Sequence, residues 1–356
     1  MNEFWRGRRV LVTGDTGFKG AWLCLWLGYL GARVSAFALP PASEPSLYAL
    51  AGPWEGQDHR ILDLRDAAAV AGAVQRAAPE IVFHLAAQAL VRASYRDPIG
   101  TYATNLMGTL HVLDAVRQAP GVKAVVVTTT DKVYDNLELG HPFAEQDRLG
   151  GDDPYSNSKA CAELAIAAFR EAFFADAGSA AIATARAGNV LGGGDWAADR
   201  LVPDLVRAAT AKRKLRLRYP DAVRPWQHVL DPLQGYLMLA QRLALRPKDC
   251  PNALNFGPDT GSVLSVAKLA ERFDAAFGTK LGWEREPGDH PKEARTLTLD
   301  AGLARRRLGW RPRLDGDATV GWTVDWYRAW QQGADMRRFS LEQIARYEAL
   351  GGSATG

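Results

Sequence analysis

Cysteine is scarce in this sequence, with three residues in a chain of 356. Cys24, Cys161 and Cys250 are far apart and odd in number, so they predict neither a disulfide framework nor a metal site. A chain without disulfides is typical of a reducing compartment, and we expect a cytoplasmic protein.

Long apolar runs are missing as well. The longest, residues 21–32, is too short to span a bilayer and is typical of a buried helix. Residues 1–14 lack the charged start, apolar stretch and cleavage site of a signal peptide. We therefore expect no association with a membrane.

An excess of one charge is also absent, since 43 Lys and Arg residues and 40 Asp and Glu residues leave a net charge of +3. This balance does not favour nucleic acid as a partner. The basic run at residues 212–218 contains no aromatic residue. A solvated face with one or two phosphate contacts therefore explains it better than nucleic-acid binding.

The first half of the chain alternates short apolar runs with helical patterns. This alternation predicts an α/β fold with a doubly wound parallel (Rossmann) sheet, whose ligands bind at the carboxyl ends of the strands. Strands are predicted at residues 9–13, 32–39, 59–62, 81–85, 124–130 and 180–186, and helices at 18–30, 66–77, 98–117 and 155–176.

The rhythm changes after Asn189, where Gly192, Gly193 and Gly194 predict a flexible loop. Further helices are expected at residues 203–211, 231–245, 264–277 and 317–331, and strands at 214–218, 252–256 and 296–299. We predict a dinucleotide-binding domain and a smaller C-terminal α/β substrate domain. The first comprises residues 1–190 plus about 229–257, the second about 191–228 plus 258–335, and residues 336–356 form a C-terminal tail.

A glycine-rich turn with the spacing G-x-x-G-x-x-G follows the first strand and opens the first helix. Glycine lets the backbone turn tightly and approach a pyrophosphate at the positive helix N-terminus. A structural turn without a ligand is the alternative. The position of the turn favours a dinucleotide site that contains Gly14, Thr16, Gly17, Phe18, Lys19 and Gly20.

The ends of the next strands extend this predicted site. No acidic residue occurs at residues 35–40, so the residues themselves do not separate NAD from NADP. Asp63 is placed either to meet the adenine or to cap a helix. Small side chains after the fourth strand would let the backbone lie against the cofactor. The remaining predicted cofactor residues are Leu64, Leu85, Ala86, Ala87, Gln88, Asn105 and Thr128.

Tyr155 and Lys159 are spaced i, i+4 and would share one face of a helix. An adjacent ammonium lowers the pKa of a phenol toward neutral, which would let Tyr155 accept a substrate proton. The spacing alone is common on helix surfaces. Its place after the fifth strand, together with the polar strand end Thr130-Asp131-Lys132, favours a catalytic site over a surface ion pair.

The glycine-rich turn, the Thr130-Asp131-Lys132 strand end and Tyr155-x-x-x-Lys159 together resemble the extended short-chain dehydrogenase/reductase family, in its nucleotide-sugar 4,6-dehydratase branch. The likeness runs from about residue 8 to 330. Longer strings at residues 16–23, 130–134, 153–156, 188–196 and 224–229 are similar to those of the members that act on CDP-glucose. The resemblance implies NAD as the cofactor and CDP-glucose as the substrate. Lys132 departs from the branch, where glutamate is usual.

The resemblance further implies a dehydration with no net redox change. Tyr155 takes the proton of the glucose 4-hydroxyl while hydride passes from C4 to NAD. Lys159 holds Tyr155 ionised and binds the nicotinamide ribose, and Thr130 hydrogen-bonds the 4-hydroxyl. The 4-ketone acidifies the C5 proton; Lys132 is assigned as the base that removes it and Asp131 as the acid for the 6-hydroxyl. A charged Lys132 would instead stabilise the enolate, with another group or water as base.

The diphosphate of a nucleotide sugar needs cations, a need that Arg200 and Arg224 meet. The family position places Asn189 near the sugar or the phosphates, and Trp226 and His228 in the nucleotide pocket. Core packing explains Trp226 equally well. The full predicted substrate set is Asn189, Arg200, Leu201, Arg224, Trp226, His228 and His290.

Two other functions stay open. A nucleotide-sugar 4-epimerase would share the tyrosine, the lysine and the glycine-rich turn, but it would lack the acid–base pair after Thr130. A non-catalytic dinucleotide sensor could dispense with Tyr155 and Lys159. The family pairs helices like those at residues 98–117 and 155–176 across a two-fold axis, so we expect a homodimer or a dimer of dimers.

Overall fold

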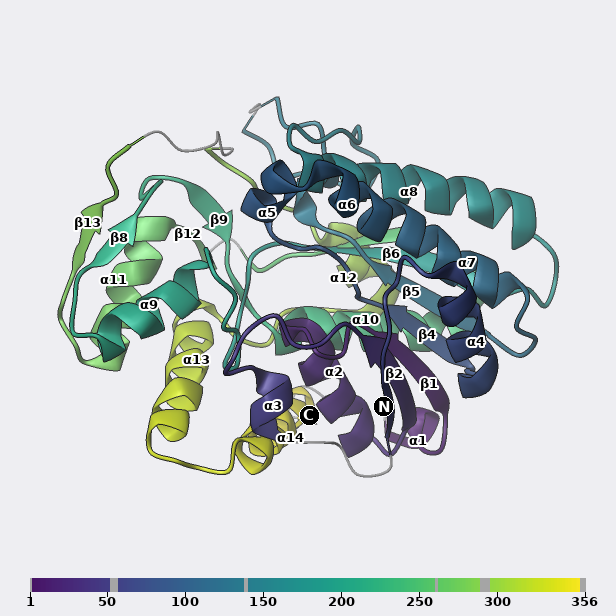
Figure 1. The fold of residues 1–356 in the computed structure, drawn as a ribbon, viewed down its shortest axis with the longest axis horizontal. Helices are drawn as coiled ribbons and strands as arrows, with labels where there is room; N and C mark the ends of the chain where they lie inside the picture. Colours follow the sequence, from purple (N-terminus) through teal and green to yellow (C-terminus); the bar gives the residue numbers. More distant parts are fainter. Residues whose placement is uncertain (1, 52–56, 138–139, 260–261, 289–294, 353–356) are drawn as a thin grey trace.

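The computed structural model describes residues 2–51, 57–137, 140–259, 262–288 and 295–352. Its centre is a seven-stranded parallel sheet with the order β11-β6-β5-β4-β1-β2-β3 (Figure 1). The sheet reverses its direction of growth between β1 and β4, the point at which such sheets bind ligands. The predicted doubly wound fold is therefore confirmed. The strands are β1 (Arg9–Thr13), β2 (Arg33–Ala38), β3 (Asp58–Ile61), β4 (Ile81–His84), β5 (Ala124–Thr128), β6 (Ala181–Ala187) and β11 (Ala253–Phe256).

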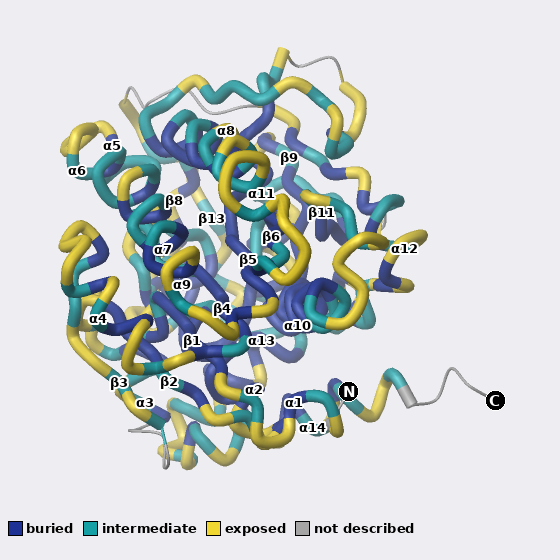
Figure 2. Tube along the Cα trace, turned by 90° about the vertical axis from the view of Figure 1, so that its right-hand side faces the viewer, coloured by how far each residue is buried: buried dark blue, intermediate teal, exposed yellow. Residues whose placement is uncertain are grey.

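Both faces of this sheet are covered, because alternate side chains of each strand enter different cores. Val10 and Val12 of β1 belong to the larger core, whereas Leu11 belongs to the smaller one. Figure 2 shows β4, β5 and α10 as buried tube. The smaller core is covered by α4 (Ala67–Ala77), α7 (Gly108–Arg117) and α8 (Pro154–Phe173), the larger by α2 (Phe18–Tyr29), α10 (Leu230–Leu245) and α14 (Met336–Gly352).

Helix α8 begins where its sequence dictates. Asp153 accepts hydrogen bonds from the backbone N–H groups of Tyr155 and Ser156, Pro154 occupies the first turn, and Ser156 completes a capping box. The cap therefore fixes Tyr155 in the first turn of the helix, at the carboxyl edge of the sheet.

The helix predicted at residues 98–117 is not continuous. It consists of α6 (Pro98–Tyr102), a π-helical turn η1 (Ala103–Met107) and α7, and is preceded by α5 (Val91–Arg96). Within η1, buried Asn105 bonds the backbone of Gln88 and the hydroxyl of Ser158. These bonds anchor the widened turn to the loop after β4 and to α8.

A smaller group of elements lies to the left of the sheet in Figure 1. It contains α9 (Leu201–Thr210), β8 (Leu215–Leu217), β9 (Val223–Pro225), β12 (Val263–Ser265), α11 (Val266–Phe277), β13 (Trp283–Arg285) and α13 (Gly316–Gln331). Strands β8 and β13 are parallel, and β9 and β12 are antiparallel. The other elements are α1 (Asn2–Trp5), α3 (Leu47–Ala51), η2 (Asp131–Val133), β7 (Val190–Leu191), β10 (Gln227–His228), η3 (Pro247–Asp249) and α12 (Gly302–Leu308).

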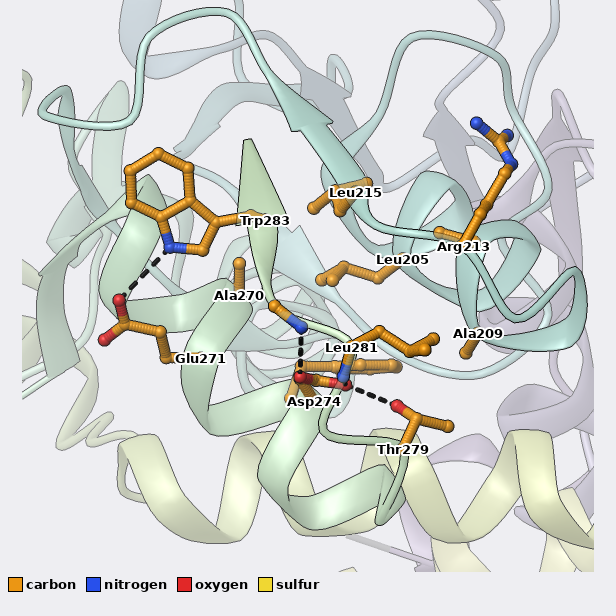
Figure 3. Close-up of a pocket in the computed structure, with 13 residues that line it drawn as sticks. Leu205, Ala209, Arg213, Leu215, Ala270, Glu271, Asp274, Thr279, Leu281 and Trp283 are labelled. Carbon is orange, nitrogen blue, oxygen red and sulfur yellow. Dashed lines mark hydrogen bonds between the residues drawn. The ribbon is translucent and has the colours of Figure 1, made fainter. Parts of the chain in front are cut away.

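Figure 3 shows how α9, β8, α11 and β13 of this smaller group pack around one recess. Asp274 of α11 accepts hydrogen bonds from the hydroxyl of Thr279 and from the backbone of Leu281 and Gly282, which shapes the turn into β13. The recess beside it, between α9, α11 and β8, holds only about 20 Å³. That volume suits about one water molecule, so the recess is packing rather than a binding site.

Two expectations about the second half are wrong. The expected flexible loop is instead a buried turn that contains Gly192, Gly193 and Gly194. The ring of Trp326 packs so closely against Gly193 that a Cβ there would overlap it. Residues 296–299 form no strand, since Thr296 and Leu299 bridge to different partners and no ladder develops. Residues 336–352 of the expected tail form α14, which packs against α2, α3 and α13. No helix in the described part of the chain combines the length and the hydropathy needed to cross a membrane.

Candidate active site

A cleft of about 1250 Å³ runs along the carboxyl edge of the sheet and beside the smaller group of elements. The ends of β1 to β5 line one part, and residues around α9, β8 and β9 line the other. A site for one small ligand typically measures about 300–1,000 Å³. The cleft therefore has room for a dinucleotide and a second ligand together.

The glycine-rich turn forms one wall of this cleft. Gly14 has a φ of +84°, and a Cβ there would lie 2.6 Å from the backbone nitrogen of Ala86. A Cβ on Gly20 would overlap the carbonyl of Gly14. No side chain caps the N-terminus of α2 after Gly17. Its first N–H groups are thus available to a phosphate, and the turn fits a dinucleotide.

The ends of β2 and β3 line the next part of the cleft. Leu39, Pro40 and Ser43 lie there without an acidic neighbour from β2, and Thr16 donates to the carbonyl of Leu39 at 2.9 Å. Asp63 also lines the cleft, but its carboxylate accepts four hydrogen bonds from Arg65, which lower the pKa of Asp63. The helix cap considered for Asp63 is wrong, because Asp66 caps α4 instead.

The predicted cofactor residues lie together along this wall, with one exception. Asn105 is fully buried and does not line the cleft. It instead holds Gln88 in place from behind. The predicted residues that line the cleft are Gly14, Thr16, Gly17, Phe18, Lys19, Gly20, Asp63, Leu64, Leu85, Ala86, Ala87, Gln88 and Thr128.

The five residues predicted as catalytic meet where β5 ends. Thr130 donates to Asp131 Oδ1 at 3.1 Å, and Lys132 Nζ lies 3.7 Å from the same oxygen. The side chain of Asp131 is 2% exposed, and its Oδ2 has no hydrogen-bond partner among the described residues. Tyr155 and Lys159 line the same part of the cleft from α8. A buried carboxyl oxygen without a partner is suited to a hydroxyl of a ligand.

The surroundings of Tyr155 differ from the expectation. Burial raises the pKa of Tyr155 to about 12, although a hydrogen bond with Thr130 and the charge of Arg200 oppose the shift. The predicted shift of the Tyr155 pKa toward neutral is therefore wrong, because the pKa is raised instead. Burial also lowers the pKa of Lys159 to about 8, against the charge of Glu163. Lys159 donates to the carbonyl of Thr128 at 3.1 Å.

Positive charge gathers between this site and α9. Burial and, to a smaller extent, the charge of Arg200 lower the pKa of Lys19 to about 8. Arg200 itself donates to Asp195 at 3.0 Å. Asn189 Oδ1 is buried and has no hydrogen-bond partner in the described ranges. This combination of cations and an unpaired amide oxygen suits a phosphate-bearing, hydroxylated ligand.

One predicted substrate residue does not line the cleft. His228 is fully buried, accepts a bond from the backbone of Leu230 and packs against Trp322. Burial lowers its pKa to about 3, which is typical of a neutral core histidine. His290 lies outside the described residues. Arg200, Leu201, Arg224, Trp226 and Asn189 line the cleft as expected.

One feature of the cleft could not be predicted from the sequence. Asp199 accepts hydrogen bonds from Arg92 of α5 at 3.2 Å and from Arg218 at 3.0 Å, and all three residues line the cleft. The three come from segments far apart in the chain, so no local pattern pointed to them. Elsewhere in the described residues, no three His, Cys, Asp or Glu side chains form a group that could hold a metal ion.

Comparisons with known proteins agree with this geometry. The family model for GDP-mannose 4,6 dehydratase matches residues 11–321. A CDP-glucose 4,6-dehydratase of Salmonella typhimurium is 44% identical to this chain and covers 97% of both chains. A solved UDP-glucose 4-epimerase from Stenotrophomonas maltophila, with bound NAD and formylated UDP-arabinopyranose, has a TM-score of 0.79 at 26% identity over 92% of this chain and 100% of that one. A dTDP-glucose 4,6-dehydratase from Bacillus anthracis in complex with NAD has a TM-score of 0.76 at 21% identity over 92% and 99%.

Proposed function

The chain belongs to the GDP-mannose 4,6-dehydratase family, and we propose that it is a lyase that converts CDP-glucose to CDP-4-keto-6-deoxyglucose and water with NAD as its cofactor. The observation that carries this proposal is the 44% identity to a CDP-glucose 4,6-dehydratase across 97% of both chains. The geometry supports it, because the cleft brings an acid–base pair and a Tyr–Lys pair to one strand end.

The turn at residues 14–20 and the N-terminus of α2 would hold the pyrophosphate of NAD, with Asp63 and Leu64 at its adenine end. Bound there, NAD would supply a hydride acceptor opposite C4 of the sugar, and its reduced form would supply the hydride donor for C6. The tight approach of Gly14 to Ala86 leaves the backbone itself as the cradle. This cradle suits a cofactor that is retained through the whole reaction.

Tyr155 accepts the proton of the 4-hydroxyl as the sugar is oxidised, and Thr130 orients that hydroxyl. Thr130 and Tyr155 both line this part of the cleft, so one sugar hydroxyl can bind between them. Lys159, held by the carbonyl of Thr128, supplies a positive charge beside the site. General base catalysis of this kind contributes roughly 10²–10⁴-fold in rate.

Asp131 and Lys132 carry out the elimination. The 4-ketone makes the C5 proton acidic, and Lys132 removes it. Asp131 protonates the departing 6-hydroxyl through Oδ2, the oxygen that has no partner among the described side chains. Arg200, Arg224 and Asn189 bind the diphosphate and the sugar.

A product assay tests the proposal. The purified protein is incubated with CDP-glucose and NAD, and the product is placed in strong base, where a 4-keto-6-deoxy sugar absorbs in the near ultraviolet. We expect this absorbance together with a mass lower by one water. Turnover of UDP-, GDP- or dTDP-glucose in preference to CDP-glucose would overturn the assignment of the substrate.

A 4-epimerase is the second candidate, because an epimerase with bound NAD shares the fold at a TM-score of 0.79. An epimerase needs only oxidation and reduction at C4, so Asp131 and Lys132 would not act as the acid and base of an elimination. The same assay separates the two, since an epimer keeps the mass of the substrate and does not absorb in base.

The assembly is proposed to be a homodimer, with a dimer of dimers as the larger form. Large apolar side chains are exposed on neighbouring elements α6, η1 and α8, among them Ile99, Met107, Leu164 and Phe173. Apolar groups exposed together on one region mark an interface more often than a solvated face. The free thiols of Cys24, Cys161 and Cys250 support a reducing, cytoplasmic setting.

A further inference from the structure

Helix α8 places three polar side chains one turn apart against the end of β5. Tyr155, Lys159 and Glu163 are all buried. Two of them bond successive threonines: Lys159 Nζ donates to the carbonyl of Thr128, and Thr129 donates to Glu163 Oε1 at 2.5 Å. Tyr155 lines the cleft beside the next one, Thr130. The mechanism above uses the first two of these side chains and leaves Glu163 without a task.

The carboxylate of Glu163 accepts hydrogen bonds from three different side chains. Besides Thr129, its carboxylate accepts bonds from Thr184 at 2.8 Å and from Arg186 of β6 at 2.9 and 2.8 Å. The side chains of Glu163 and Arg186 are each 4% exposed. Apolar replacements of a buried ion pair are often neutral or better for stability, so stability alone does not explain the pair.

Arg186 carries the network to the far end of the catalytic turn η2. Its Nη1 donates to the hydroxyl of Tyr134, the residue that follows η2, at 2.8 Å. Tyr134 in turn donates to Asn255 Oδ1 of β11 at 2.7 Å. The pair thus holds Thr129 just before Asp131-Lys132 and Tyr134 just after them.

We infer that Glu163 and Arg186 are positioning residues that clamp both ends of the Asp131-Lys132 turn against the helix that carries Tyr155 and Lys159. The inference rests on the proposed function and adds to it a link between its two steps. Sugar oxidised at C4 then meets the elimination pair without a rearrangement of the protein. A displacement of about 1 Å in such groups costs up to roughly 100-fold in rate.

The test removes one link of the clamp while the reacting groups stay in place. Tyr134→Phe keeps the ring that lines the cleft and deletes only the hydroxyl that Arg186 and Asn255 hold. Thr184→Val is the second variant, because it removes one bond to Glu163 from outside the cleft. Tyr347→Phe is the matched control, a buried tyrosine that donates to Asp231 at 2.7 Å away from the cleft.

Rapid quenching and mass spectrometry follow the two steps separately, since oxidised CDP-glucose and the dehydrated product differ in mass. For Tyr134→Phe we expect dehydration to slow by about 10- to 100-fold while C4 oxidation stays within about threefold of wild type. Thr184→Val should shift the ratio of the two rates in the same direction. Amide hydrogen exchange at residues 131–134 should quicken in both variants but not in Tyr347→Phe.

The outcomes separate the clamp from the proposed function. Wild-type protein that does not dehydrate CDP-glucose refutes the function and the clamp with it. Wild-type turnover with an unchanged ratio of the two rates in Tyr134→Phe and Thr184→Val refutes the clamp alone. The same shift of the ratio in Tyr347→Phe would also refute it. If Tyr134→Phe does not fold, the ratio in Thr184→Val decides.

Discussion

Lys132 and Asp131 stand next to each other at the strand end, with Nζ 3.7 Å from Oδ1. We predict that Lys132→Met, which keeps the length of the side chain and removes the amine, retains C4 oxidation. Water loss should fall by about 100-fold or more, because the base for the C5 proton is gone. Quenched reactions analysed by mass spectrometry check this. Lys123→Met is the control, a half-exposed lysine paired with Glu80. Full dehydration by Lys132→Met would exclude Lys132 as the base.

The dependence of kcat/KM on pH follows from the number of protons that Tyr155 and Lys159 hold together. With pKa values of about 12 for Tyr155 and about 8 for Lys159, both groups are protonated below pH 8. The reactive form, a phenolate beside an ammonium, holds one proton fewer. We therefore expect kcat/KM to rise about tenfold per pH unit up to about pH 8 and then to level off. Initial rates measured from about pH 6 to 9 test whether kcat/KM rises with pH. A kcat/KM that falls as pH rises through neutrality would contradict the prediction.

The position of a single residue in the site was predictable where a strand end and the first turns of a helix both indicated the same edge of the sheet. Thr130, Asp131, Lys132, Tyr155 and Lys159 all line the cleft as expected. His228 shows the limit, because sequence spacing does not say which way a side chain points. Strand β10 is only two residues long, and the histidine turns into the core against Trp322.

At the scale of elements, glycine positions separate packing from flexibility. We predict that Gly193→Ala destabilises the protein by about 1–3 kcal/mol, because the new methyl group would overlap Trp326. Gly72→Ala is the matched control, a glycine within α4 with open space around its Cβ position. That change should stabilise by up to about 1 kcal/mol.

Urea unfolding of the two glycine variants, monitored by tryptophan fluorescence, gives both free energies of unfolding. Equal stabilities for Gly193→Ala and wild type would show that the turn yields easily to the added methyl group, as a flexible loop does. A loss confined to Gly193→Ala supports a turn fixed by its contacts with Trp326 and Trp22.

Long elements with a clear period were predictable, and most short ones were not, with the three-residue strand β8 as an exception. Apolar runs gave strands β1 to β6 and β11, and helices α2, α4 and α8, within a few residues. The two- and three-residue strands β7, β9, β10, β12 and β13 carry no periodic signal of their own. The π-helical turn η1 was also missed, since it depends on bonds from Asn105 to residues distant in the chain.

At the scale of the whole molecule, the exposed apolar region predicts the assembly. Leu164→Glu places a charge at a side chain that is 60% exposed on α8, and we expect the dimer to dissociate, because a buried unpaired charge costs several kcal/mol. Leu245→Glu, at an equally exposed leucine at the end of α10, is the control and should stay dimeric. Light scattering coupled to size exclusion measures both masses. A Leu164→Glu protein with the wild-type mass would place the interface elsewhere.

The arrangement of the site across the molecule was only partly within reach of the sequence. Motifs placed the cofactor wall and the strand-end pair, since parallel strands bring their carboxyl ends to one edge. The contact of Asp199 with Arg92 and Arg218 and the network behind Glu163 depend on segments that meet only in the folded chain.

In the proposed reaction, the hydride that leaves C4 of a sugar returns to C6 of the same sugar while water is lost. The direct measurement uses CDP-glucose that carries deuterium at C4, with the product examined by NMR. We predict that the deuterium appears at C6 of CDP-4-keto-6-deoxyglucose. Deuterium that stays at C4, or that is missing from the product, would contradict the account.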